Sequence, residues 1–177
     1  GRLLAMYAAL KSVQDHLAVY AMPSRRPEFL DSLLTTLDEL KSSCVTGAQL
    51  AQIGEETEGL DGEKLRDLGL IFGAYEAMTA RGPLDPRDKL TRLAEKLRTT
   101  PFFQGKDVYL DGFTDFTPQQ DLVLEAILRQ AHSVTLALTW GEGELFSPAK
   151  KTIASVKRLA AKTGQPVAET LLEGVAQ

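Results

Sequence analysis

The sequence predicts a mostly helical α/β protein in which a helical subdomain is followed by a small parallel sheet. In residues 1–100, apolar residues recur every three to four positions, the spacing that places them on one face of a helix. In residues 101–177, short β-prone runs alternate with helical patterns. That order is typical of parallel strands joined by right-handed helical crossovers. We therefore expect two domains, 1–100 and 101–177.

The first hundred residues predict helices separated by proline, glycine or acidic segments. Pro27 and Pro86 stand at the first position of a predicted helix, where a missing N–H costs little, and Asp85 is a predicted N-cap. The acidic stretch 55–62 is expected to be a mobile loop. The apolar stripes are assigned to the core and carry no predicted function. The predicted helices are 2–20, 27–42, 48–53, 63–80 and 86–99.

The remaining residues predict a β-α-β-α-β order with about three parallel strands. Thr117, Pro118 and Gln120 form a capping-box pattern at the start of one helix, and Ser147-Pro148 predicts the cap of the next. Such a sheet is small, so we expect the chain to be a fragment of a larger protein that supplies more strands. The predicted strands are 108–111, 134–139 and 167–171, and the predicted helices are 118–130 and 148–163, the second ended by Gly164.

Composition excludes several classes of function. The net charge of −4 and pI near 5.3 argue against a nucleic-acid footprint over the whole surface, although not against a local one. Cys44 is the only cysteine of the 177 residues, which excludes an intrachain disulfide and a Cys-based metal cluster and favours a reducing, cytoplasmic setting. No apolar run approaches the roughly 18 residues of a membrane span, so no membrane partner is expected.

Two stretches are candidates for function. The predicted strand VYLD ends at Asp111, the position from which α/β proteins present ligands to phosphate or metal, although many such strand ends bind nothing. The predicted helix after Ser147 carries five cations within about 140° of its circumference and no acid, a candidate contact for a phosphate backbone or a partner. A solvated basic face is the alternative. These five residues are Lys150, Lys151, Lys157, Arg158 and Lys162.

A family resemblance follows from the stretch VYLDGFTDFTPQQDLVLEAILRQAHSVTLALTW. It resembles AddB, the B subunit of bacterial AddAB (RexAB-type) ATP-dependent helicase–exonucleases, which carries a strand, then DGF, then FTPQE, then a helix and a VTxxL strand. Upstream, EKLRDLGLIFGAYEAM and LDPRDKL are similar to further AddB stretches, so the resemblance covers nearly the whole chain. Gln120 stands where the family usually has Glu.

The resemblance implies a helicase-like site that has lost its catalytic carboxylate. In active superfamily-1 helicases the equivalent strand ends in Asp-Glu, where Asp holds Mg²⁺ and Glu polarises the attacking water. Asp111, Asp115 and Gln120 match the conserved Asp, second Asp and Gln of that pattern, but Gly112 replaces the Glu. We therefore expect no catalytic residue, no metal ligand and no cofactor in this chain, and a structural role for Asp111.

The resemblance also implies a place in a larger complex. Residues 1–100 would form a helical 1B-like subdomain and residues 101–177 part of a RecA-like domain. In the family, the ATP/Mg²⁺ phosphate loop lies upstream, and the nuclease with its iron–sulfur cluster lies downstream. The implied partners are the A subunit and DNA, in a complex that processes double-strand DNA ends for recombinational repair.

Two other readings stay open at this point. The chain could be a protein-interaction module whose helices dock a partner motor subunit without touching DNA. It could also belong to an active superfamily-1 helicase, if another segment supplied the missing Glu. If the basic face contacts DNA, charge reversal at Lys150, Lys151 and Arg158 should weaken binding.

Overall fold

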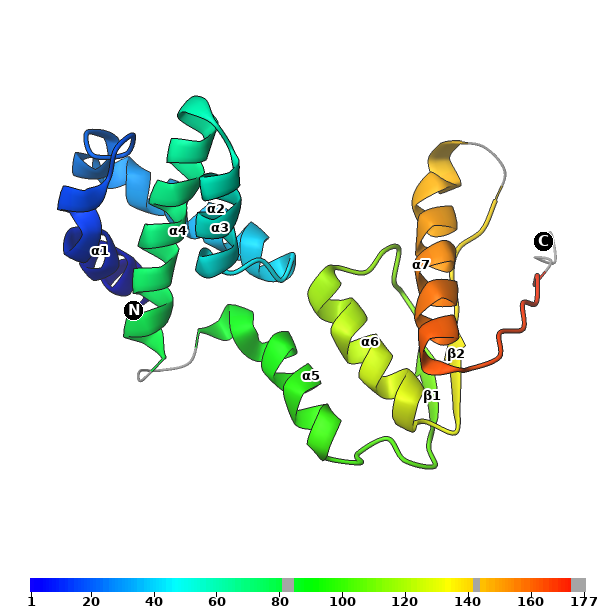
Figure 1. The fold of residues 1–177 in the computed structure, drawn as a ribbon. Coiled ribbons are helices and arrows are strands. Elements are labelled where there is room, and N and C mark those ends of the chain that lie inside the picture. The colour runs from blue at the N-terminus through cyan, green and yellow to red at the C-terminus, as the bar shows by residue number, and fades with distance from the viewer. Residues whose placement is uncertain (81–84, 142–143, 173–177) are drawn as a thin grey trace. The chain divides into compact units, whose positions relative to one another are not determined.

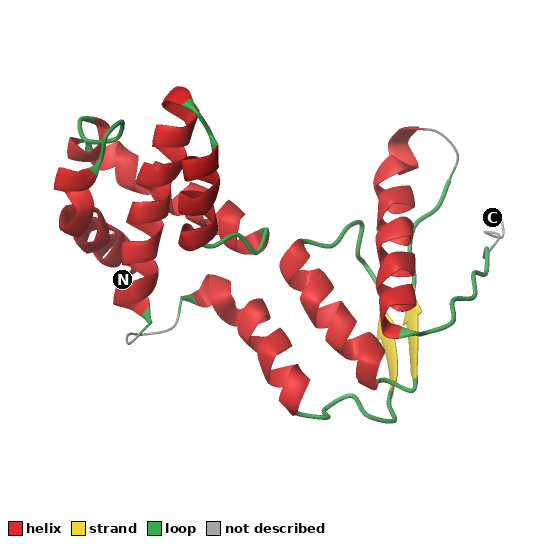
Figure 2. Ribbon diagram, in the orientation of Figure 1, coloured by secondary structure: helices red, strands yellow, loops and turns green. Residues whose placement is uncertain are grey.

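The computed structural model, which describes residues 1–80, 85–141 and 144–172, confirms the mostly helical α/β class (Figure 1 and Figure 2). The chain divides into two compact units, Gly1–Arg92 and Leu93–Gln177, where the sequence placed a division near residue 100. None of the helices in the described residues is long and apolar enough to cross a membrane.

The first unit is built from helices that enclose one apolar core. Met6, Phe72 and Tyr75 are fully buried in it, together with Leu33 and Leu37. Short 3-10 turns cover Gln14–His16, Pro23–Arg25 and Pro86–Asp88. The helices are α1 (Arg2–Val13), α2 (Pro27–Ser42), α3 (Gly47–Glu56) and α4 (Gly59–Thr79), and α5 (Lys89–Thr99) follows them.

Helix α1 ends at Val13, although the sequence predicted a helix up to residue 20. The cause lies in α4, where the buried Asp67 carboxylate accepts hydrogen bonds from the backbone N–H groups of Ala18, Val19 and Tyr20 at 2.8–3.0 Å. Those N–H groups cannot also donate to carbonyls one turn earlier, so the chain leaves the helix before it reaches them.

The acidic stretch 55–62, predicted to be a mobile loop, is mostly helical. Helix α3 continues to Glu56, and α4 begins at Gly59. Glycines permit the two helices to approach closely: a Cβ added at Gly69 would lie 2.7 Å from the Ala51 nitrogen, and one at Gly54 would lie 2.8 Å from the Arg66 nitrogen. This close packing gives short helices a tertiary partner, which local propensity alone does not reveal.

The second unit contains a two-stranded parallel sheet and two long helices. Strands β1 (Asp107–Leu110) and β2 (Ser133–Leu136) pair in parallel, with Leu110 opposite Leu136. Helix α6 (Pro118–Gln130) connects them, and α7 (Ser147–Thr163) follows β2 after a 3-10 turn at Glu144–Phe146. Side chains along both strands alternate between half-buried and exposed, and Tyr109 is 75% exposed. Within the described residues only one face of the sheet is therefore covered, although the nearly continuous apolar sequence of residues 134–139 is typical of a parallel strand covered on both faces.

Three local predictions for this unit were wrong. Residues 167–171 form no strand; Glu169 pairs instead with Lys157 of α7. β2 stops at Leu136 because β1 ends at Leu110 and offers no further ladder partner after Ala137 N donates to the Leu110 carbonyl. Ser147 does not cap α7, because the preceding 3-10 turn places it inside the helix. The predicted stop at Gly164 is confirmed, with φ of +74°.

Candidate functional site

The end of β1 presents Asp111 to solvent. Its side chain is exposed, and Oδ1 accepts a hydrogen bond of 2.7 Å from the backbone N–H of Gly112. Gly112 has φ of +80°, a conformation that side chains other than glycine rarely adopt, so the chain turns sharply there. The carboxylate therefore closes a turn at the strand end, and the structural role of Asp111 stays a prediction.

Among the described residues, no contact brings the side chains of Asp115 and Gln120 together with that of Asp111 around one ligand position. Asp115 is exposed, with Thr114 Oγ1 at 3.5 Å from its Oδ1. Gln120 is used as a cap: its Oε1 accepts from Thr117 N at 2.8 Å, and its own N–H donates to Thr117 Oγ1 at 3.3 Å. This capping box confirms the predicted start of α6.

The loop between β1 and α6 is held from two sides. Its two aromatic rings, Phe113 and Phe116, stack on each other with centroids 4.9 Å apart. The buried Thr152 of α7 donates from Oγ1 to the Thr114 carbonyl at 2.8 Å. In the part of the chain that the structure describes, no three His, Cys, Asp or Glu side chains are grouped so as to hold a metal ion. The ring stacking and the Thr152 hydrogen bond indicate that this loop is a fixed connection from β1 to α6.

The basic face of α7 is partly neutralised by acids. Lys157 is paired with Glu169, and Lys162 Nζ lies 2.7 Å from Glu125 Oε2 on α6. Lys162, together with Arg129, holds the pKa of the Glu125 carboxyl below its usual value. Such contacts join α7 to its surroundings and leave less charge for an external partner.

Arg158 faces a further acid on α6. Burial raises the pKa of the Asp121 carboxyl, and the charge of Arg158 and a hydrogen bond from Ser155 oppose that rise. Lys150 lies over the Trp140 ring, with Nζ 5.6 Å from the centroid, while Lys151 is exposed. Of the five predicted cations, three therefore interact with acids of the same unit.

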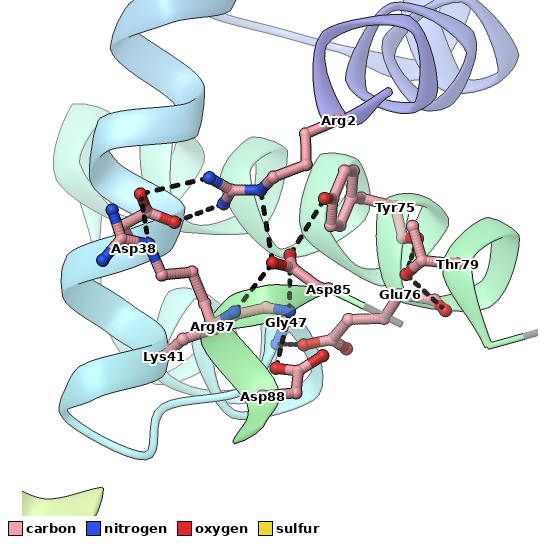
Figure 3. Close-up of polar contacts among 10 residues, drawn as sticks. All are labelled: Arg2, Asp38, Lys41, Gly47, Tyr75, Glu76, Thr79, Asp85, Arg87 and Asp88. Atoms are coloured by element: carbon pink, nitrogen blue, oxygen red, sulfur yellow. Dashed lines mark hydrogen bonds and ion pairs between the residues drawn. The ribbon is translucent and has the colours of Figure 1, made fainter. Parts of the chain in front are cut away.

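A second polar cluster, which the sequence did not reveal as such, is centred on the buried Asp85 (Figure 3). Its carboxylate accepts from Tyr75 Oη and from Lys41 Nζ, both at 3.0 Å, and from the Arg87 backbone N–H, as predicted for an N-cap. Arg2 Nε lies 3.2 Å from Oδ1.

These contacts fix the charge of Asp85. Burial alone would raise the pKa of its carboxyl, but the Arg87 N–H, Lys41 and Tyr75 together hold that pKa below its usual value. Around this centre, Arg2 and Arg87 also pair with Asp38, and Lys41 with Asp88. The cluster joins α1, α2 and α4 to the turn before α5 and is stabilising in character.

Both buried carboxylates of the first unit left only faint signals in the sequence. Asp67 follows Arg66 between Leu65 and Leu68, so the local sequence shows a charged pair and does not distinguish the buried residue of the two. Asp85 was recognisable as a cap, but its two cationic neighbours, Arg2 and Lys41, come from distant segments. Spacing along one chain cannot report contacts of that kind.

Comparison with known proteins decides the family. The family model described as "ADDB, N-terminal" matches residues 1–177. The chain belongs to this ADDB N-terminal family. The predicted resemblance to AddB is therefore confirmed over the full length of the chain.

Three curated relatives of this ADDB domain share one name, that of the B subunit of an ATP-dependent helicase/deoxyribonuclease. The protein from Moorella thermoacetica is 36% identical over 179 residues, covering 93% of this chain and 16% of the relative. The protein from Thermoanaerobacter sp. strain X514 is 36% identical over 161 residues, covering 86% and 14%. That from Clostridioides difficile is 28% identical over 176 residues. The chain thus spans about a sixth or less of the length of these relatives.

The stretch from Asp111 to Gln120 is the part of this chain for which the sequence analysis predicts a degenerate helicase motif. Its strand, turn and capped helix are present in the structure. The prediction that Gly112 replaces a catalytic Glu stays a prediction, and glycine provides no side chain for that purpose.

Proposed function

We propose that this chain is a non-catalytic, helicase-like part of an AddB-type protein and that it serves as a scaffold and guides DNA. The parent complex would process double-strand DNA ends for recombinational repair, and the relatives' name supports its helicase and deoxyribonuclease activities. The observation that carries the proposal is the strand end at Asp111. Its carboxylate bonds the N–H of Gly112, and Gly112 supplies no second carboxylate.

The residues at this strand end do not fit an ATP/Mg²⁺ hydrolysis site. Such a site needs a metal-holding Asp together with a group that polarises the attacking water, and a loop that surrounds the phosphates. Here Asp111 closes a turn, and Gln120 caps α6. In our proposal ATP/Mg²⁺ and the iron–sulfur cluster of the parent family are bound by other parts of the complex.

We assign residues 1–100 to a 1B-like subdomain and residues 101–177 to part of a RecA-like domain. The parallel β1–β2 pair with its intervening helix supports the second assignment. The A subunit and DNA are the proposed partners, and the cytoplasm is the proposed location, since one cysteine in 177 residues fits a reducing compartment.

A protein-interaction module is the second candidate function, and one observation favours it. Leu3, Leu4 and Tyr7 lie along α1 with roughly half or more of their surface exposed, Leu4 at 68%. Exposed apolar side chains gathered on one helix are typical of docking surfaces. In this alternative, α1 would dock the partner motor subunit, and DNA would not touch the chain.

Two parallel binding measurements separate the candidates. In the first, the chain is titrated into a fluorescein-labelled single-stranded oligothymidine at low and moderate salt. In the second, it is captured by immobilised A subunit, with Leu4→Glu as the variant and Leu171→Glu, also on an exposed position, as the control. DNA guidance predicts salt-sensitive DNA binding. If Leu4→Glu abolishes capture by the A subunit and the chain binds no DNA at any salt concentration, the interaction module replaces DNA guidance as the proposed function.

A further inference from the structure

Helix α5 carries a row of cations that the sequence patterns did not single out. Lys89, Arg92 and Lys96 are three and four residues apart, which aligns them on one side of the helix. All three are exposed, and no ion pair among the described residues involves any of them. We call these three residues the α5 basic row.

The row contrasts with the basic face of α7. There, Lys157 and Lys162 are paired with glutamates and Arg158 lies near Asp121. A cation already close to a carboxylate gains less from a phosphate, because binding must compete with the existing pair. On α5 the sole acid is Glu95, against four basic residues in a chain whose net charge is −4. The α5 basic row is thus a local positive site on an acidic protein.

The spacing of the row suits a nucleic-acid strand. All three positions belong to one continuous helix, so helix geometry alone fixes their separation (Figure 1). A rise of about 1.5 Å per residue places Lys89 and Lys96 roughly 10 Å apart along the axis. This distance is comparable with the span of a few consecutive phosphates, which follow each other about every 3.4 Å along one strand of a duplex.

An exposed aromatic ring follows the helix. Phe102, in the turn after α5, is 58% exposed, and Lys106 Nζ lies 4.0 Å from the centroid of its ring. A cation beside an accessible aromatic ring is the combination on which proteins stack unpaired bases. An acidic protein partner would pair with the cations but would not require the exposed aromatic ring of Phe102.

We propose that the α5 basic row binds the backbone of single-stranded DNA and that Phe102 stacks on one of its bases. The inference rests on the proposed function, because it names the element through which the chain would guide DNA. The α7 cations then contribute less to binding than the α5 row does.

The test compares two charge reversals of equal size. Lys89→Glu/Lys96→Glu changes the α5 row, and Lys150→Glu/Lys151→Glu changes the α7 cations that have no acid partner among the described residues. Binding of labelled oligothymidine is followed by fluorescence anisotropy over a range of salt concentrations. Circular dichroism confirms that each exposed substitution leaves the fold intact.

The α5 variant should bind at least tenfold more weakly, and the slope of log affinity against log salt should become shallower by about 1.4, since each lost phosphate contact removes about 0.7. In the α7 variant, the slope of log affinity against log salt should change by less than half of that amount. Phe102→Ala should weaken binding roughly tenfold without changing the slope, because stacking involves no counterion release.

The negative outcomes are distinguishable. If the unmodified chain binds DNA and the α5 variant binds equally well, the inference is wrong and the proposed function stands. If the unmodified chain binds no DNA, DNA guidance and the α5 site are both wrong. If the α5 reversal weakens capture by the A subunit and not DNA binding, the row is a protein-docking site.

Discussion

Asp67 ties the segment after α1 to α4 through three backbone hydrogen bonds, with only 2% of its surface exposed. Replacement by Ala would leave three N–H groups without their acceptor. Each unsatisfied buried donor costs about 1–3 kcal/mol, so Asp67→Ala should lower the free energy of unfolding by about 3 kcal/mol or more. Urea denaturation measures this loss.

A matched control is available on the same helix. Asp61 is exposed and, among the described residues, pairs with Lys64 in the next turn, so Asp61→Ala should change the unfolding free energy by about 0.5 kcal/mol or less. Equal effects of the two substitutions would show that the Asp67 contacts do not stabilise the unit.

Asp85 should make the stability of the first unit depend on pH. Its folded-state pKa lies below the usual value, so its ionised form favours the folded state. This contribution is complete above the unfolded pKa of about 3.9 and is lost as the pH falls through the lower folded-state pKa. Asp85→Asn should therefore cost about 3 kcal/mol near neutral pH and clearly less in strong acid.

The measurement is urea unfolding of the protein and of Asp85→Asn at neutral pH and at a series of acidic pH values below the unfolded pKa of about 3.9. The two unfolding free energies are compared at each pH. If the difference between the two unfolding free energies does not change with pH, the prediction that ionised Asp85 stabilises the folded unit is contradicted.

At the scale of elements, the α3–α4 hairpin depends on glycines at specific positions. A Cβ at Gly69 would lie 2.7–2.9 Å from the backbone and side chain of Ala51, whereas a Cβ at Gly73 would have no neighbour within 4 Å. Gly69→Ala should destabilise the protein by about 1–3 kcal/mol through overpacking. Gly73→Ala should stabilise it by about 0.5–1 kcal/mol, because alanine favours helix. Thermal unfolding followed by circular dichroism compares the pair, and a gain from both substitutions would contradict the close approach.

Elements with local signals were predictable. Pro27, the Thr117–Gln120 capping box and Gly164 marked ends that the structure confirms. Elements that depend on distant contacts were not. Helix α1 ends early because of Asp67, which lies nearly fifty residues away in the sequence. The segment 167–171 had the composition of a strand, but Glu169 contacts α7 instead.

The candidate site was predictable to a similar extent. The strand, turn and capped helix around Asp111 could be inferred from local patterns, and so could the absence of a side chain at Gly112. The acids that neutralise Lys157 and Lys162 could not, because Glu125 and Glu169 meet α7 only in the folded unit. The same limit hid the α5 basic row, since whether a cation has an acid beside it is visible only once the fold is known.

At the scale of the whole molecule, the ADDB family membership and the geometry at Asp111 support one account. The chain spans 14–16% of the relatives that it matches. In our proposal it retains the framework of a helicase motif around Gly112, which lacks the catalytic side chain. We therefore propose that this chain supports DNA and that other parts of the complex hydrolyse ATP.

ATP hydrolysis by the chain tests this separation most directly. Phosphate release is measured with Mg²⁺ and ATP, with and without single-stranded DNA, for the unmodified chain and for Asp111→Ala. The account predicts no turnover above background for either protein under either condition, and unchanged DNA affinity in Asp111→Ala. DNA-stimulated turnover that Asp111→Ala abolishes would contradict it and would make this strand end an active ATPase site.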